Sequence, residues 1–232
     1  MGVDMFTGIA YEEISMVFED RADAGMRLAG KLKKYKGKDA AVVALPRGGV
    51  PVGFEIAKAL QLPLDILIVR KIGSPFNPEY GIGAIAEGNV LYVDEDAVER
   101  FDITRKQINE IARKEKEELE RRRDVYRRDR KPLPLRNKIV ILADDGLATG
   151  VTAIAGILAI RKQQPKKLIL AVPGCPAELV KPMESLVDEF ICLSFEEDFS
   201  AVGQLYHNFA QVSDEEVITF ILPGSRDSDS QR

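Results

Sequence analysis

Short apolar runs recur along the chain, and most of them are followed by a turn signal and then by a helical pattern. The runs are rich in β-branched residues and almost continuously hydrophobic, which is typical of strands in a parallel sheet covered on both faces. They predict strands at residues 41–45, 64–69, 90–93, 139–143, 168–172 and 190–193. Strands that alternate with helices indicate an α/β fold with a parallel, Rossmann-like sheet and right-handed crossovers.

Helical periodicity lies between several of these runs. Apolar residues spaced three and four apart predict helices at 50–60, 151–163 and 177–186. An earlier helix is expected at 22–34, with Asp20 as its candidate N-cap.

Residues 105–138 form a different kind of segment. Thr104 and Gln107 have the spacing of a capping box, and the highly charged run after them carries few large apolar residues. Lys and Arg number 14 in this segment against 7 Asp and Glu, a local excess of 7 positive charges. We therefore expect a charged helical insertion in the α/β domain over residues 100–134.

This charged segment has two interpretations. It is either a solvated helix stabilised by i,i+4 ion pairs such as Glu117–Arg121, or a basic surface for RNA or a partner protein. The absence of interleaved aromatic residues favours the solvated helix. Nucleic acid is therefore an unlikely ligand, although RNA binding stays an alternative.

The bulk composition is that of an ordinary soluble globular protein. Of 232 residues, 45% are hydrophobic and 30% charged, and the net charge of -4 gives no reason to expect an anionic membrane as a partner. No apolar run approaches the roughly 18–20 residues of a membrane helix, and the first residues lack the basic start of a signal peptide. We expect one cytoplasmic domain over 1–222, followed by a disordered tail at 223–232.

The cysteine and histidine counts exclude several classes of site. The chain has two cysteines, Cys175 and Cys192, and His207 is its only histidine. These residues cannot make a disulfide framework, a zinc site or a histidine-based catalytic triad.

The segment 139–152, IVILADDGLATGVT, carries the strongest chemical signal. A buried strand ends at two acids, Asp144 and Asp145, at the sheet edge where α/β folds bind ligands. Two glycines and the start of a helix follow, so several N–H groups can point at one anion. The carboxylates would repel a phosphate, so they must serve hydroxyl groups or a metal-bound hydroxyl. A ligand with a phosphate beside a diol, such as ribose 5-phosphate, fits both features.

Other interpretations of this segment stay open. A P-loop would need a lysine where the chain has Val151, and a dinucleotide-binding GxGxxG pattern is absent. An ordinary strand–turn–helix with a solvated acidic pair remains the plainest alternative.

Two further segments carry candidate groups. In 41–53, a strand runs into a glycine-rich turn with Arg47, Gly48 and Gly49, and the plain interpretation is a simple turn with Arg47 in solvent. In 66–88, a strand is followed by a long Gly/Pro/Asn-rich stretch, which is either a mobile lid or a surface loop. The basic and acidic candidates of this stretch are Arg70, Lys71, Glu79 and Glu87. Three late aromatics could stack on a base, but core packing is the more frequent role: Phe199, Tyr206 and Phe209.

The pattern of four apolar residues, two acids, two variable residues and Ala-Thr-Gly-x-Thr resembles the phosphoribosyl pyrophosphate signature of type I phosphoribosyltransferases. This resemblance implies that Asp144 and Asp145 hold the ribose 2- and 3-hydroxyls and meet Mg²⁺ only indirectly, through those hydroxyls or water. It implies that the following residues form the donor loop, the last five around the 5-phosphate: Gly146, Leu147, Ala148, Thr149, Gly150, Val151 and Thr152.

The resemblance also gives the other two segments a role. Arg47, Gly48 and Gly49 match a pyrophosphate-binding loop, and Arg70 and Lys71 would neutralise pyrophosphate under a closing loop. Glu79 and Glu87 are the acid/base candidates. In the hypoxanthine-guanine branch of the family an aspartate acts as general base where this chain has Ala148, so that group is missing here.

The motifs FEDRADAG at 18–25 and DFSAVGQLYHNF at 198–209 extend the resemblance over nearly the whole chain, to a group of uncharacterised prokaryotic phosphoribosyltransferases. The resemblance implies an Mg²⁺-dependent glycosyltransferase of nucleotide salvage, transferring a phosphoribosyl group from phosphoribosyl pyrophosphate to a purine or pyrimidine base, and a homodimer by family habit. Two alternatives stay open: a nucleotide-sensing regulator that binds RNA through 105–138, and a relative that only hydrolyses the donor. The sequence does not fix the acceptor base.

Overall fold

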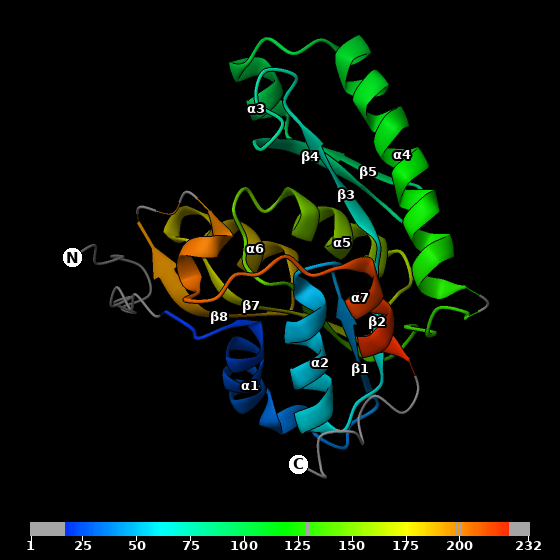
Figure 1. The fold of residues 1–232 in the computed structure, drawn as a ribbon, viewed down its shortest axis with the longest axis vertical. Helices are drawn as coiled ribbons and strands as arrows, with labels where there is room; N and C mark the ends of the chain where they lie inside the picture. Colours follow the sequence, from blue (N-terminus) through cyan, green and yellow to red (C-terminus); the bar gives the residue numbers. More distant parts are fainter. Residues whose placement is uncertain (1–16, 129, 198, 200, 223–232) are drawn as a thin grey trace.

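A parallel five-stranded sheet forms the centre of the molecule, with the strand order β2-β1-β6-β7-β8. The computed structural model describes residues 17–128, 130–197, 199 and 201–222. The strands of this sheet are β1 (Ala40–Ala44), β2 (Leu64–Ile66), β6 (Ile139–Ala143), β7 (Lys167–Pro176) and β8 (Glu189–Glu196). The predicted α/β fold with a parallel sheet is confirmed (Figure 1).

Helices cover both faces of the sheet, which explains the continuous hydrophobicity of its strands. On one face lie α1 (Arg21–Lys31) and α2 (Gly49–Leu60), and on the other lie α5 (Val151–Arg161) and α6 (Val180–Leu186) (Figure 1). The remaining core helix is α7 (Asp214–Ile221), and three short 3-10 turns lie at Lys33–Tyr35, Ala177–Leu179 and Val202–Leu205. The predicted N-cap of α1 is confirmed, because Asp20 accepts hydrogen bonds from the N–H groups of Ala22 and Asp23, both at 2.9 Å.

The register of β1 and β6 determines where the site forms. Ala40 pairs with Ile139 and Ala44 with Ala143, so the two strands end side by side. The N–H of Leu45, just beyond β1, still donates to the carbonyl of Ala143 at 3.0 Å. The two loops that follow these strands therefore leave the sheet as neighbours.

A second unit, which we call the arm, is inserted between β2 and β6. It consists of a three-stranded antiparallel sheet, β3 (Val69–Gly73), β4 (Gly81–Ala86) and β5 (Val90–Val93), followed by α3 (Glu95–Arg100) and α4 (Arg105–Arg127). The arm projects from the core beside α5 (Figure 1).

Three sequence predictions in this region are wrong. The single strand expected at 64–69 is divided between β2 and β3, which belong to different sheets. The strand at 90–93 exists, but it pairs antiparallel with β4 rather than joining the parallel sheet. The stretch 66–88 is mostly a β3–β4 hairpin rather than a long irregular loop, because its apolar residues Ile72, Ile82 and Ala84 are fully buried in the arm.

Helix α4 confirms part of its prediction. The capping box of Thr104 and Gln107 is present. The helix is not wholly solvated, however, because Ile108, Leu119 and Tyr126 are buried.

The expected ion pair between Glu117 and Arg121 is replaced by others. Glu117 pairs with Arg113 at 2.8 Å, whereas Arg121 pairs with Glu118 at 2.7 Å and with Asp214 of α7 at 3.3 Å. Glu118 also receives Arg122, and together the two guanidinium groups lower the pKa of Glu118 to about 2. The pairs with Glu117 and Glu118 lie within the segment and leave its net excess unchanged, whereas Asp214 offsets one positive charge from outside it. Because these guanidinium groups are held by carboxylates of the protein itself, the structural interpretation is favoured over an RNA-binding surface.

A buried ion network joins the arm to the core. Arg127, the last residue of α4, donates to Asp65 of β2 at 2.9 Å and to Glu87, just after β4, at 3.1 and 3.2 Å. All three side chains are at most 15% exposed. Asp65 also accepts from the N–H of Leu133, and Glu87 from the N–H of Ile68. The network thus holds the chain where it enters and leaves the arm.

The proposed tail at 223–232 lies outside the described residues, as do residues 1–16. Helices α3 and α7 have no counterpart among the predicted elements. Among the described helices, none combines the length and hydrophobicity of a membrane span.

Candidate active site

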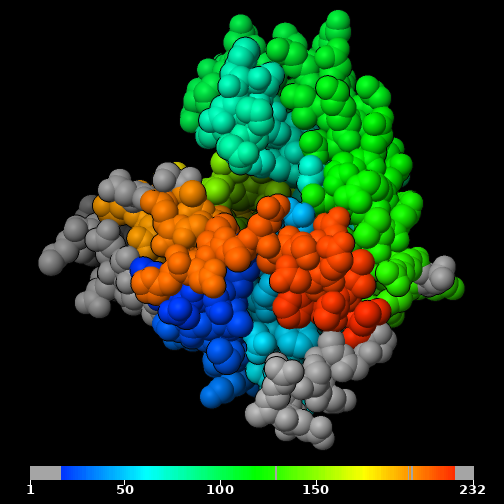
Figure 2. Space-filling view, in the orientation of Figure 1, coloured from blue at the N-terminus to red at the C-terminus, as the bar shows by residue number. Residues whose placement is uncertain are grey.

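The loops after β1 and β6 and the hairpin of the arm enclose a cleft of about 250 Å³. Figure 2 shows the molecule hollowed between the arm and the core. The core lines the cleft with Leu45, Pro46, Arg47, Gly48, Asp144, Asp145, Gly146, Ala148, Thr149, Gly150, Val151, Thr152 and Val202, and the arm with Val69, Lys71 and Glu79. Most of the predicted site residues therefore meet in one place.

Asp144 and Asp145 form a buried acidic pair at the end of β6. The N–H of Asp145 donates to the Asp144 carboxylate at 2.9 Å. Burial raises the pKa of Asp144 well above its ordinary value, and the neighbouring Asp145 carboxylate raises it further. Burial also raises the pKa of Asp145, although the Arg21 guanidinium opposes that rise. Hydroxyl groups of a bound ligand could donate hydrogen bonds to the ionised carboxylates of this pair and so offset the cost of their burial.

Arg21 and Tyr206 hold Asp145 in place. Arg21, at the start of α1, donates from Nε to Asp145 Oδ2 at 2.8 Å and from Nη1 to the carbonyl of Ala210 at 2.7 Å. Its guanidinium also lies 3.9 Å from the ring centroid of Phe209. The Tyr206 hydroxyl donates to the main-chain carbonyl of Asp145 at 2.6 Å. Both the side chain and the backbone of Asp145 are thereby fixed from outside its own loop.

The loop from Gly146 to Gly150 presents backbone donors. Gly146 and Gly150 have φ values of 149° and 75°, which favour glycine. Within the described residues, no backbone hydrogen bond uses the N–H groups of Ala148, Thr149 or Gly150. The N–H of Ile154 donates to the carbonyl of Gly150, so the preceding N–H groups at the start of α5 stay available as well. This arrangement is an anion site built from main-chain dipoles.

Arg47, Gly48 and Gly49 form the second loop. The Pro46–Arg47 peptide bond is cis. A β-carbon on Gly48 would lie 1.9 Å from Asp145 Oδ2, and one on Gly49 would lie 2.8 Å from the carbonyl oxygen of Ala143. The two loops can thus touch only because these residues are glycines. The Arg47 guanidinium is partly exposed and lies 3.5 Å from Asp214 of α7.

The arm contributes Lys71 and Glu79. The Lys71 ammonium donates to the main-chain carbonyl of Glu79 at 2.8 Å and lies 3.3 Å from its carboxylate. Gly81 of β4 lies against the end of the Gly146–Gly150 loop and the start of α5. A β-carbon on Gly81 would be 2.9 Å from Thr149 Oγ1 and 2.7 Å from the Val151 side chain. The hairpin therefore closes over the loop and adds a cation and a carboxylate to the cleft.

Leu147 of the predicted donor loop is buried beneath the cleft, with its N–H bonded to the carbonyl of Gly174 at 3.0 Å, and two predicted charged residues lie elsewhere. Arg70 and Lys71 are adjacent in β3, so their side chains lie on opposite faces of the strand. The Arg70 guanidinium pairs with Glu115 of α4 at 2.7 Å. Glu87 belongs to the buried network of Arg127. Neither lines the cleft, so the acid/base role suggested for Glu87 and the pyrophosphate role suggested for Arg70 do not fit the structure.

The late aromatic residues pack rather than line the cleft. Tyr206 is buried with Phe18, and Phe199 packs against the same cluster. Phe209 stacks on Tyr206, with ring centroids 5.2 Å apart. These contacts agree with the core-packing interpretation of the sequence.

Sequence reasoning missed Arg21, Asp214 and Gly81 as parts of the site, and it considered Tyr206 only for stacking on a base and not for its hydrogen bond to Asp145. Each reaches it from an element far along the chain; Arg21 and Asp145, for example, are 124 positions apart. The FEDRADAG motif contained Arg21, but nothing in its local pattern pointed to Asp145.

The family of this chain follows from its similarity to known proteins. Residues 16–210 match the model of the phosphoribosyl transferase domain. The chain belongs to this family. It is 44% identical over 211 residues to a Mycobacterium tuberculosis protein, present in strains CDC 1551 and H37Rv, that is named provisionally as a phosphoribosyl transferase. The match covers 91% of this chain and 48% of the relative, so the chain spans about half the length of the curated relatives it matches.

Solved structures give the same fold. The crystal structure of TT1426 from Thermus thermophilus is 35% identical and superposes with a TM-score of 0.73, covering 89% of this chain and 98% of that one. A purine phosphoribosyltransferase from Pyrococcus horikoshii is 15% identical with a TM-score of 0.47, covering 86% of this chain and 99% of that one, a likeness too distant to support an argument. The membership of the phosphoribosyl transferase family is thus confirmed, and the fold is that of TT1426.

Proposed function

We propose that this phosphoribosyltransferase transfers the 5-phosphoribosyl group of phosphoribosyl pyrophosphate to a ring nitrogen of a purine or pyrimidine base. The observation that carries the proposal is the convergence, in one cleft, of an acidic pair, a loop of free backbone N–H groups and a second glycine loop with Arg47. These three features match the diol, the 5-phosphate and the diphosphate of the donor.

Each group of residues in the cleft would bind the part of the donor that matches its charge. Main-chain N–H groups from Ala148 to Thr152 would hold the 5-phosphate, and Asp144 and Asp145 would accept hydrogen bonds from the ribose hydroxyls. As the bond from ribose C1 to the pyrophosphate oxygen breaks, negative charge grows on the leaving diphosphate. Arg47, Lys71 and the N–H groups around Gly48 would stabilise that charge, while the acidic pair favours the positive charge on the ribose ring.

Mg²⁺ would be held indirectly in this site. Among the described residues, no group of three or more His, Cys, Asp or Glu side chains could hold a metal ion. The available donors are the two carboxylates and whatever oxygens the substrate brings, which suits an ion that keeps several waters and binds through phosphates. When bound, Mg²⁺ would supply charge neutralisation at the diphosphate.

The acceptor nitrogen loses a proton when it bonds to the ribose, and a group in the cleft must accept that proton. Ala148 cannot accept it, and Asp144 and Asp145 are assigned to the ribose. Glu79 lines the cleft with a carboxylate that is 93% exposed beside Lys71, and we assign it the role of proton acceptor. Glu79→Gln should then lower kcat at neutral pH more than it changes the KM for the donor.

Donor-dependent release of pyrophosphate, screened across free purine and pyrimidine bases with Mg²⁺, tests the proposal. The wild type should release pyrophosphate only when a suitable base is present, and Asp144→Asn/Asp145→Asn should release none. Release without any base would instead identify a hydrolase of the donor. If no base supports release above the level of the double variant, the transferase proposal fails.

A further inference from the structure

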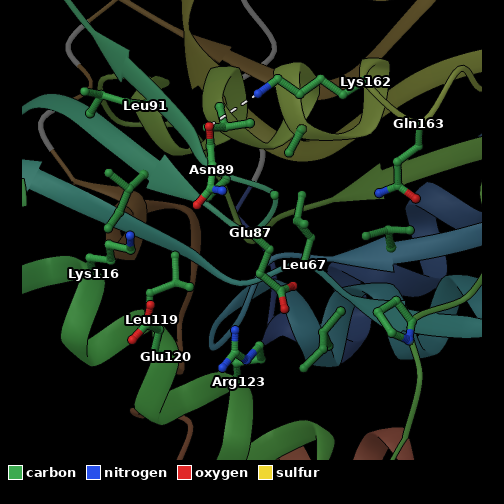
Figure 3. Close-up of a pocket in the computed structure, with 18 of the residues that line it drawn as sticks. Leu67, Glu87, Asn89, Leu91, Lys116, Leu119, Glu120, Arg123, Lys162 and Gln163 are labelled. Carbon is green, nitrogen blue, oxygen red and sulfur yellow. Dashed lines mark hydrogen bonds between the residues drawn. The ribbon is translucent and has the colours of Figure 1, made fainter.

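A second and larger cavity of about 780 Å³ lies between α4 of the arm and the core. It shares no lining residue with the candidate active site. Figure 3 shows Lys116, Leu119, Glu120 and Arg123 on α4 on one side of this cavity, and Lys162 and Gln163, just after the end of α5, on the other. Its volume falls within the range of small-molecule sites, about 300–1,000 Å³.

The two walls of the cavity differ in character. The core and the arm sheet supply an apolar wall, in which Val43, Leu67, Val90 and Leu135 are buried and Leu91 at the edge is 52% exposed. The wall from α4 is mostly polar. It consists of residues spaced three and four apart along one face of the helix: Asn109, Ala112, Arg113, Lys116, Leu119, Glu120, Arg123 and Arg127.

Positive charge dominates the polar wall. Arg127 is saturated by Asp65 and Glu87, and these three lining side chains together carry one net negative charge, so they offer no cation to a ligand. The other charged lining residues are four cations, Arg113, Lys116, Arg123 and Lys162, and one anion, Glu120. Arg113 pairs with Glu117 at 2.8 Å and Arg123 with Asp124 at 3.2 Å, so Lys116 and Lys162 are the cations left for a ligand. Within the described part of the chain, Lys116 forms no ion pair, and Lys162 donates only to the main-chain carbonyl of Asn89 at 3.3 Å.

An apolar wall that faces a basic helix is complementary to one kind of small molecule. Its apolar body would lie against Leu67, Val90 and Leu135, and its anionic head would lie near Lys116. A neutral apolar ligand would leave the cations unused, and a nucleic acid would leave the apolar wall unused.

We infer that the cavity between α4 and the core is a binding site for a small amphipathic carboxylate, an apolar chain or ring system with one acid group. Such a ligand would contact both α4 and the core next to the Arg127 network. Its binding should therefore stabilise the arm against the core and raise the melting temperature, because a ligand that binds only the folded state shifts unfolding.

Decanoate is a suitable probe, with decylamine and decanol as controls of equal chain length. The chain has no tryptophan, so Leu91→Trp places a single fluorescent reporter at the edge of the cavity. Decanoate, kept below micellar concentrations, should shift the emission to shorter wavelength in a saturable titration and raise the melting temperature. Decanol should bind at least about tenfold more weakly and decylamine more weakly still, since one charge-assisted contact contributes roughly that factor.

Two variants and one control substitution locate the binding. In the Leu91→Trp background, Lys116→Glu should weaken decanoate at least about tenfold, whereas Lys114→Glu, on the same helix but outside the lining, should leave its affinity within about twofold. Ala112→Trp, made in the wild-type chain, fills the cavity and should abolish the decanoate-dependent rise in melting temperature.

Three results would overturn the inference. The first is equal binding of decylamine and decanoate. The second is a decanoate affinity that Lys116→Glu and Lys114→Glu change alike. The third is no decanoate binding to the wild type combined with a change of sedimentation coefficient in Ala112→Trp, which would make this face a contact between copies of the chain.

Discussion

The core and the arm supply residues to the same cleft by different means. In the core, two strands end side by side and each passes through a glycine turn into a helix, so backbone groups form the site. In the arm, Lys71 and Glu79 act through their side chains, and their position depends on a sheet joined to the core by the buried charges of Arg127, Asp65 and Glu87. The core site thus depends on small residues and the arm on charge balance.

Substitutions in the two regions should therefore affect different properties of the protein. Adding a methyl group to a core loop should damage the chemistry and spare the fold. Removing a charge at the base of the arm should damage the fold first. The following variants test that division.

The largest expected effect is at the base of the arm. Arg127→Met leaves the carboxylates of Asp65 and Glu87 buried without their cation, and breaking such a network costs about 3–5 kcal/mol. Urea unfolding should show this loss in the free energy of unfolding. Arg105→Met removes an exposed pair with Glu95 at the other end of α4 and should cost under about 1 kcal/mol. Equal losses for the two variants would contradict the role given to the network.

The next effect is in the core loops. Gly48→Ala places a methyl group against the Asp145 carboxylate, which Arg21 holds in place, so one of the two must move. Misplacement of this size lowers kcat/KM about 100-fold in a preorganised site. Pyrophosphate release measures the loss, and the melting temperature should change little.

Gly30→Ala is the matched control for this substitution. Gly30 is an exposed residue of α1 with no atom within 4 Å of an added β-carbon. Alanine there should stabilise the helix by about 0.5–1 kcal/mol and leave turnover unchanged. If Gly48→Ala behaves in the same way, the contact between the two loops has no part in turnover.

A smaller effect is expected at Arg21, which positions Asp145 without touching the cleft itself. Arg21→Met should raise the KM for the donor about tenfold, because one charge-assisted hydrogen bond orients the carboxylate. Arg21 opposes the rise in the pKa of Asp145, so its removal should raise that pKa and move the acid limb of donor binding to higher pH. A pH series of donor affinity measures both changes.

Arg27→Met tests whether any loss of charge on α1 has this effect. Arg27 forms an exposed i,i+4 pair with Asp23 on the same helix. Its removal should change neither the KM nor the pH profile. A KM change without a pH shift in Arg21→Met would point to a merely structural role for Arg21.

The smallest effect concerns the pH dependence of stability. The pKa of Asp144 is raised in the folded protein above its ordinary value of 3.8, so the ionised carboxyl destabilises the fold. Stability should therefore fall as the pH rises from about 4 through the folded pKa, and Asp144→Asn should remove part of that fall. Its melting temperature should match the wild type near pH 4 and exceed it by a few degrees at pH 8. A gain that is equal at both pH values would contradict the raised pKa.

The positions of the two core loops could be predicted from the sequence because the relevant pattern is local. A buried strand, two acids, glycines and a helix start lie within 139–152, and the same logic placed Arg47, Gly48 and Gly49. Parallel strands end at one edge of the sheet, so proximity of the two loops followed from the fold class.

The arm was predicted poorly for the opposite reason. Gly81, Gly83 and Gly88 made the 66–88 stretch look irregular, yet Gly81 and Gly83 lie within β4, where neighbouring atoms leave no room for a side chain. The partners of Glu87 and Arg70 lie 40 and 45 positions away, and no short pattern predicts such pairs. One contact in the core sheet was equally hidden from the sequence. The sulfur atoms of Cys175 and Cys192 lie 3.6 Å apart on the adjacent strands β7 and β8, although the spacing of these residues fits no short motif.

Equilibrium binding of phosphoribosyl pyrophosphate with Mg²⁺ tests the central claim most directly, because it depends on neither the acceptor base nor turnover. Isothermal titration calorimetry should show saturable binding to the wild type at one site per chain. Binding to Asp144→Asn/Asp145→Asn should be at least about 100-fold weaker, through loss of two charge-assisted contacts to the ribose. Equal affinity in both proteins, or no binding to the wild type, would contradict the assignment of this cleft as the phosphoribosyl pyrophosphate site.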